Sequence, residues 1–188
     1  MQYSQIRDSL RTGDICLHSH TGFIPHLIKK ITGSPISHIS MVVVLNGVVM
    51  ELESTWDKVA NGVRLSNMGY NMANMEKGSR VWVRQYSGSW NIELDYVFRR
   101  FYPLCKNKHY ELNYVSMILA AYKLNWFSDT KTVFCSELIA WFLQYAGIID
   151  KKLVSDNWTP ADFSVERGTL DNHVIIGSFA QETEIVKG

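Results

Sequence analysis

Cys135 is the side chain of this sequence that is best placed for nucleophilic chemistry. It stands in Thr132-Val133-Phe134-Cys135-Ser136-Glu137, where an apolar pattern of helical spacing begins and runs to Gly147. Unpaired N–H groups and the dipole of a first helical turn stabilise a thiolate, lowering a cysteine pKa to about 3.5–7.5. We therefore expect a reactive thiol at a helix N-terminus capped by Thr132. The alternative is a buried core thiol, because free cysteine is among the most buried residue types.

A cysteine nucleophile needs a base to take its proton and a polar group to orient that base. His38 is the candidate base, in the β-rich segment 36–45, and Glu51 is the candidate orienting group, in the segment 48–53. The alternatives are a packed strand histidine for His38 and a solvated carboxylate for Glu51.

The Asn46-Gly47 dipeptide predicts a two-residue hairpin turn between these two segments. The turn makes His38 and Glu51 diagonal neighbours about four residues out of register, so strand pairing alone does not bring them into contact. Glu53 shares the strand face of Glu51, since side chains alternate along a strand, and is an equally eligible partner for His38.

The composition predicts one folded domain spanning residues 1–188. Hydrophobic residues make up 46% of the chain and charged residues 20%, which is typical of a globular protein rather than a disordered one. The net charge of +1, without a block of like charges, disfavours nucleic-acid binding. The first residues lack the basic segment and apolar run that are typical of a secretory leader, and no apolar stretch is long enough to span a membrane. An odd number of cysteines, three, then favours reduced thiols, so we expect a soluble cytoplasmic protein.

Strand patterns dominate the first half of the sequence and helical patterns the second half. This order predicts an α+β fold with a mainly antiparallel sheet and helices packed on one face. The expected strands are 13–18, 36–45, 48–53, 61–65, 80–86 and 173–177; the expected helices are 23–31, 90–102 (ending before Pro103), 114–124, the Cys135 segment and a short turn at 159–163; and 66–78 is expected to be a loop.

Five short motifs occur in a characteristic order. They are Leu10-Arg11-Thr12-Gly13-Asp14-Ile15, Ser37-His38-Ile39-Ser40-Met41-Val42-Val43, Glu51, Phe134-Cys135-Ser136-Glu137-Leu138-Ile139 and Thr159-Pro160-Ala161-Asp162-Phe163. The ordered set resembles the circularly permuted papain-like branch of the NlpC superfamily, namely the YiiX-type hydrolases with poxviral relatives. Lecithin retinol acyltransferase belongs to the wider permuted group.

The resemblance implies a role for four residues. In that family the histidine strand precedes the nucleophile helix, as it does here, so Cys135 is expected to be the nucleophile, His38 the general base and Glu51 the orienting residue. Tyr110 resembles a tyrosine that the family often carries before its middle helices, and it is a candidate for lining the cleft or donating to an oxyanion. A tyrosine packed against a helix is the alternative for Tyr110.

The expected activity is hydrolysis or transfer of an acyl group through a thioester on Cys135. The substrate would be a peptide, a lipid or another small molecule with an amide or ester bond, and no cofactor or metal is implied. Apolar residues that would suit an acyl substrate are Trp56, Phe101, Trp126 and Phe127. One alternative is a non-catalytic binding module that keeps the papain-like cleft. Another is a zinc site made by Cys16, His18, His20 and His26, whose spacing matches no standard template.

Overall fold

The fold is described by a computed structural model for residues 1–56, 61–88, 93–110, 131–153 and 155–187. The helix expected at 114–124 and the residues Trp126 and Phe127 lie outside these ranges.

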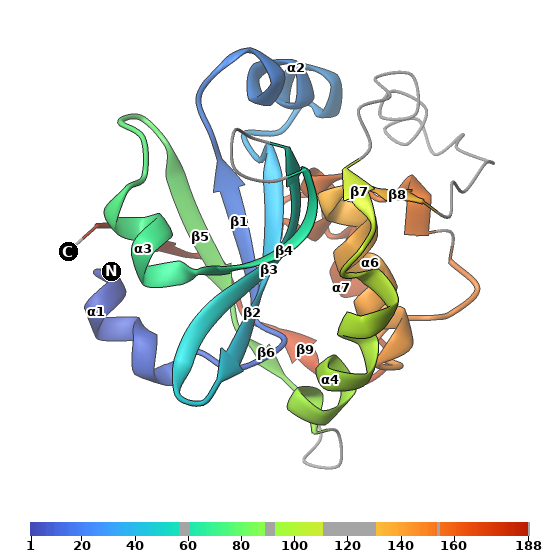
Figure 1. The fold of residues 1–188 in the computed structure, drawn as a ribbon. Helices are drawn as coiled ribbons and strands as arrows, with labels where there is room; N and C mark the ends of the chain where they lie inside the picture. The colour runs from blue at the N-terminus through green and yellow to red at the C-terminus, as the bar shows by residue number, and fades with distance from the viewer. Residues whose placement is uncertain (57–60, 89–92, 111–130, 154, 188) are drawn as a thin grey trace.

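A six-stranded sheet in the order β10-β5-β1-β2-β3-β4 forms the centre of the protein (Figure 1), and every neighbouring pair in it is antiparallel. This confirms the expected sheet. Its strands are β1 (Ile15–Ser19), β2 (His38–Leu45), β3 (Val48–Trp56), β4 (Asn61–Asn67), β5 (Arg80–Arg84) and β10 (Thr183–Ile185).

The hairpin between β2 and β3 has the predicted turn and register. Asn46 and Gly47 have φ angles of 51° and 77°, the left-handed pair that a tight hairpin turn requires. Leu45 pairs with Val48, and Met41 pairs with Leu52. This register decides which side chains of the two strands share a face.

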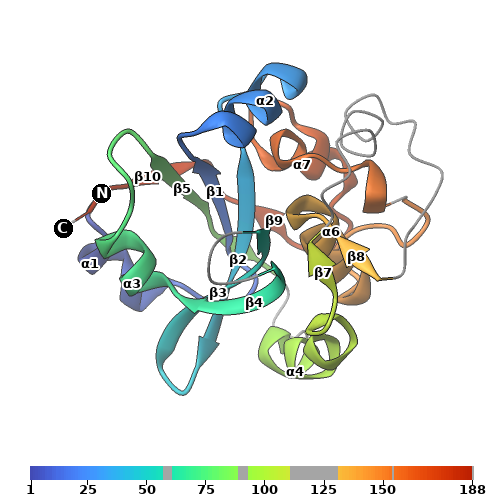
Figure 2. The same ribbon diagram turned by 45° about the horizontal axis from the view of Figure 1, so that its top comes forward.

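The two faces of the sheet carry different cores. Ile39, Met41 and Leu52 point to the larger core, which is completed by helices α4 (Leu94–Cys105), α6 (Cys135–Tyr145) and α7 (Thr169–His173). The opposite face carries Cys16 and Val42 beside a smaller core, covered by α1 (Tyr3–Ile6) and α3 (Met68–Ala73). Figures 1 and 2 show these two sets of helices on opposite sides of the sheet. Polar residues of this second face, together with Cys135 of α6, build the candidate site.

Shorter elements complete the described fold. These are η1 (Arg7–Ser9), α2 (Phe23–Thr32), the antiparallel pair β6 (Tyr86–Ser87) and β9 (Ser178–Phe179), the parallel pair β7 (His109–Tyr110) and β8 (Thr132–Val133), η2 (Ser155–Asn157) and η3 (Pro160–Phe163). No helix within the described ranges combines the length and apolar character needed to cross a membrane.

Three local predictions were wrong. The segment 66–78 is not all loop, because the side chain of Asn67 accepts a hydrogen bond from the Tyr70 N–H at 2.9 Å and caps α3. Helix α4 continues past Pro103, which lies in its last turn, to bury Cys105 in the larger core. The segment 173–177 is not a strand, because α7 includes His173 and the following residues form only an isolated bridge.

Candidate active site

Cys135 is the first residue of helix α6 and is buried. The residue before the helix is Phe134, whose backbone N–H donates to the Glu137 carboxylate at 3.2 Å. Thr132 lies in β8 and does not cap the helix, so that detail of the prediction was wrong. The thiol still occupies the first turn of α6. The backbone N–H groups of Ser136, in that turn, and of Ile39, in β2, help to hold the pKa of Cys135 low.

His38, the first residue of β2, interacts directly with Cys135. Burial alone would raise the pKa of the Cys135 thiol, but the charge and hydrogen bond of His38 outweigh it and the pKa is lowered. Burial alone would likewise lower the pKa of His38, yet the Cys135 charge and the bonds to Cys135 and Glu53 raise it to about 10. The opposite directions favour a thiolate beside an imidazolium.

The structure places Glu53, rather than Glu51, against His38. His38 Nε2 lies 3.0 Å from Glu53 Oε2, and Arg64 Nε and Ser66 Oγ donate to Glu53 Oε1 at 3.0 and 2.8 Å. These bonds overcome the cost of burial and hold the pKa of the Glu53 carboxyl well below its usual range. With Nε2 on Glu53, Nδ1 is the ring nitrogen left for the thiol.

The expected contact between Glu51 and His38 is therefore absent, and the strand register gives the reason. Extending the pairing of β2 with β3, Glu53 is two residues out of register with His38 and Glu51 is four. Diagonal neighbours two residues apart are within reach of long side chains, whereas four residues are too far.

Glu51 belongs to a second histidine–glutamate pair, with His18 of β1. His18 Nε2 lies 3.2 Å from Glu51 Oε1, while Ser40 Oγ and Asn71 Nδ2 donate to the same carboxylate at 2.7 Å each. Although burial opposes ionisation, the hydrogen bond and charge of His18 and the hydrogen bond from Asn71 lower the pKa of Glu51. His18 is directly opposite His38 in the β1–β2 register, and their ring centroids lie 5.4 Å apart.

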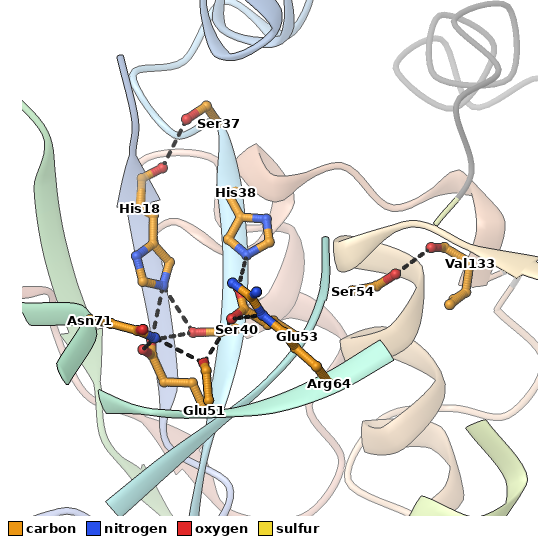
Figure 3. A network of polar contacts seen from close by, with 11 residues as sticks. His18, Ser37, His38, Ser40, Glu51, Glu53, Ser54, Arg64, Asn71 and Val133 are labelled. Atoms are coloured by element: carbon orange, nitrogen blue, oxygen red, sulfur yellow. Dashed lines mark hydrogen bonds and ion pairs between the residues drawn. The ribbon is translucent and has the colours of Figure 1, made fainter. Parts of the chain in front are cut away.

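The two pairs form one polar network, drawn in Figure 3. Asn71, contributed by α3, donates to Glu51 and also to Ser66 Oγ at 2.9 Å, and Ser66 donates to Glu53. A chain of hydrogen bonds thus runs from His18 to His38 across four strands. Buried polar groups are stable when every member has partners, so this network fixes the positions of both imidazoles.

Two cavities adjoin Cys135 and His38. The larger, which we name the chamber, has a volume of about 510 Å³ and reaches His18, His20, His38, Glu51 and Glu53. The smaller, which we name the notch, has a volume of about 20 Å³ and reaches Cys135, Ser136, Trp158, Thr159 and Pro160. Ile28, Tyr110 and Phe134 line both cavities.

Tyr110 is close to the start of helix α6. Its ring meets that of Phe134 edge to face, with centroids 6.1 Å apart, and it lies between the chamber and the notch. Trp56 lines the chamber with half of its surface exposed, whereas Phe101 is fully buried in the larger core and contributes to neither cavity.

The four residues considered for a zinc site do not come together in a geometry that could bind a metal ion. Cys16 is fully buried beside Ser40, His26 is exposed, and His18 already faces Glu51. Burial and the charges of His18 and His38 lower the pKa of His20 to about 3. Over the described ranges, no group of three or more His, Cys, Asp or Glu side chains is arranged to hold a metal ion.

The three thiols have different environments. Burial raises the pKa of Cys105 to about 12, and its Sγ lies 3.4 Å from the Tyr102 carbonyl. Burial and the Glu51 charge raise the pKa of Cys16 well above its usual value. Cys135 is the thiol whose pKa is lowered, which makes it the most nucleophilic of the three at neutral pH.

No protein-family model matches the chain, and no curated protein sequence matches it. Among solved structures, the chain is similar to the metalloprotein YiiX from Escherichia coli O157:H7, with a TM-score of 0.56 and 18% sequence identity. The match covers 95% of this chain and 97% of that one. The expected resemblance to YiiX is thus confirmed at the level of the fold: this chain has an α+β fold similar to that of YiiX, with a mainly antiparallel sheet.

Proposed function

We propose that the protein is a cysteine hydrolase or acyltransferase in which Cys135 is the nucleophile, His38 the general base and Glu53 the residue that orients His38. The observation that carries this proposal is the interaction of Cys135 with His38, which lowers the pKa of the thiol and raises that of the imidazole. The buried Glu53 carboxylate lies 3.0 Å from the imidazole, which supports its role as the orienting member of a triad.

The reaction starts with attack of the Cys135 thiolate on the carbonyl carbon of an ester or amide. A C–S bond forms, and the carbonyl electron pair moves to oxygen. The Cys135 backbone N–H at the start of α6 is suited to bind this oxyanion, and Tyr110 is the candidate for a second donor. The intermediate then expels the leaving group, which takes its proton from His38, and a thioester remains.

The thioester is released in a second step. His38, now neutral, takes a proton from a water molecule or an acceptor alcohol or amine, which attacks the thioester carbon. Collapse of the second intermediate breaks the C–S bond and returns the thiolate and imidazolium. Hydrolysis and acyl transfer therefore use the same residues and differ in the acceptor.

The proposed mechanism requires no metal. YiiX is described as a metalloprotein, whereas over the described ranges of this chain no group of three or more His, Cys, Asp or Glu side chains is arranged to hold a metal ion. Cys135, His38 and Glu53 supply nucleophile, proton transfer and orientation without one.

The pH dependence of alkylation tests the proposal. Iodoacetamide modification of Cys16, Cys105 and Cys135 would be followed by mass spectrometry, in the wild type and in His38→Ala. We expect Cys135 to react well below pH 8, ahead of the other two thiols, and to lose that advantage in His38→Ala. An inert Cys135, or one indifferent to the loss of His38, would favour a binding module over an enzyme.

A further inference from the structure

The two cavities at the candidate site differ greatly in size and in the catalytic residue that they reach. The chamber of about 510 Å³ is lined by His38 and not by Cys135, whereas the notch of about 20 Å³ is lined by Cys135 and not by His38. Pockets that bind whole small molecules measure about 300–1,000 Å³. A single water needs about 10–15 Å³ of such space. The chamber therefore has room for a large group, and the notch for one or two heavy atoms.

The mechanism places the acyl half of a substrate beside Cys135 and the leaving half beside His38. When the tetrahedral intermediate collapses, the acyl group stays bonded to Cys135 Sγ. The leaving oxygen or nitrogen must take its proton from His38, so it has to lie beside the imidazole. The acyl half therefore extends on the thiol side, and the leaving half on the imidazole side.

Resting on the proposed function, we propose that the substrate is an ester or amide with a short acyl group and a bulky alcohol or amine as leaving group. The acyl group occupies the notch and the leaving group occupies the chamber. This arrangement is the opposite of that in an enzyme whose main cavity binds a long acyl chain.

The chamber lining indicates the chemistry of the leaving group. The lining includes the apolar side chains of Ile24, Met72 and Met75, while His18 and His20 add imidazoles. His20 is neutral at physiological pH because burial and the neighbouring histidines lower its pKa to about 3. The lining suits an amphipathic group with an apolar body and a few hydrogen-bonding atoms.

Acyl length is the first variable to test. Purified protein would be mixed with 4-methylumbelliferyl acetate, butyrate and octanoate, and acylation followed by release of the fluorophore and by the mass of the Cys135 peptide. We expect the acylation rate to fall at least about tenfold from acetate to octanoate, the scale on which pockets reject extra methylenes. An octanoate rate equal to or above the acetate rate would overturn the inference.

Leaving-group size is the second variable. Ile24→Trp narrows the chamber without touching the notch, and Lys30→Trp adds the same ring at an exposed position of the same helix. We expect Ile24→Trp to lower the rate ratio of 4-methylumbelliferyl acetate to trifluoroethyl acetate about tenfold, and Lys30→Trp to leave it unchanged. A ratio that does not move in Ile24→Trp, in protein with a wild-type circular dichroism spectrum, contradicts the assignment.

The outcomes separate this inference from the proposed function. If no ester acylates Cys135 in the wild type, the hydrolase proposal fails and the substrate assignment fails with it. If esters do acylate Cys135 but long acyl groups are preferred, the enzyme proposal stands and the substrate assignment alone is wrong.

Discussion

Two histidine–glutamate pairs lie next to each other on the same face of the sheet, and they are built alike. His38 contacts Glu53 and His18 contacts Glu51, with ring centroids 5.4 Å apart (Figure 3). Each pair also has a cysteine in its surroundings. Cys135 interacts with His38, whereas burial and the nearby Glu51 carboxylate raise the pKa of Cys16.

The difference between the two cysteines lies in what surrounds the sulfur. Cys135 begins a helix of 11 residues, so N–H groups and an imidazolium favour its thiolate. Cys16 lies inside a strand, fully buried, and its strongest charged neighbour is a carboxylate. A histidine–carboxylate pair is therefore not sufficient to activate a thiol. Helix placement and direct contact with the imidazole make the distinction.

Replacing each histidine with glutamine is expected to give the largest difference between the pairs. His38→Gln removes the base, so the acylation rate of Cys135 should fall about 10²- to 10⁴-fold. His18→Gln keeps a hydrogen-bonding side chain near Glu51 and should cost less than about tenfold. Stopped-flow measurements with an activated ester provide both rates, and equal losses would remove the distinction between the pairs.

The pH profile of ester turnover should carry the signature of the first pair. As pH rises, kcat/KM increases when Cys135 loses its proton, which happens below the usual thiol pKa. It decreases near pH 10, where His38 loses the proton that the leaving group needs. His18→Gln should keep this bell shape. A profile whose upper limb lies near pH 6.5 would show that the imidazolium is not stabilised.

Replacing each glutamate should give a smaller effect in the same direction. Glu53→Gln removes the carboxylate behind His38 and should lower kcat/KM about 10- to 100-fold, the scale of changes to a group that orients a functional histidine. Glu51→Gln is the matched control on the same strand, and we expect a change of no more than about threefold. Thermal melts of both variants separate loss of catalysis from loss of folding.

Arg64→Gln is expected to have the smallest effect. Arg64 donates to Oε1 of Glu53, whereas His38 contacts Oε2. Without Arg64, the Glu53 carboxylate should therefore be held less firmly in place but keep its contact with His38. A reduction in kcat/KM of about two- to fivefold would fit a positioning role. If Arg64→Gln reduced kcat/KM as much as Glu53→Gln, Arg64 itself would have to contact the substrate.

Local sequence patterns predicted the elements that position Cys135 and His38. The Asn46-Gly47 turn predicted the β2–β3 register, and the pattern after Cys135 predicted helix α6. The same register also favoured Glu53 over Glu51, but the resemblance to permuted papain-like enzymes pointed to Glu51. Counting residues from the turn would have identified the closer glutamate.

Long-range contacts were beyond sequence reasoning. His18 was considered only as a metal ligand, because its pairing with Glu51 depends on how β1 aligns with β2, and no turn joins those strands directly. Asn71 was assigned to a loop, yet it lies in α3 and bridges the two glutamates through Ser66. The contacts of Asn71 arise from the packing of α3 on the sheet.

The most direct test of the account is the pKa of the Cys135 thiol in wild type, Glu53→Gln and Glu51→Gln. It can be measured as thiolate absorbance at increasing pH, with Cys135→Ala subtracted to remove the other thiols. We predict a lowered pKa in the wild type, a clear rise in Glu53→Gln and no change in Glu51→Gln. An ordinary thiol pKa in the wild type, or an equal response to the two glutamates, would contradict the claim that Cys135, His38 and Glu53 form one unit.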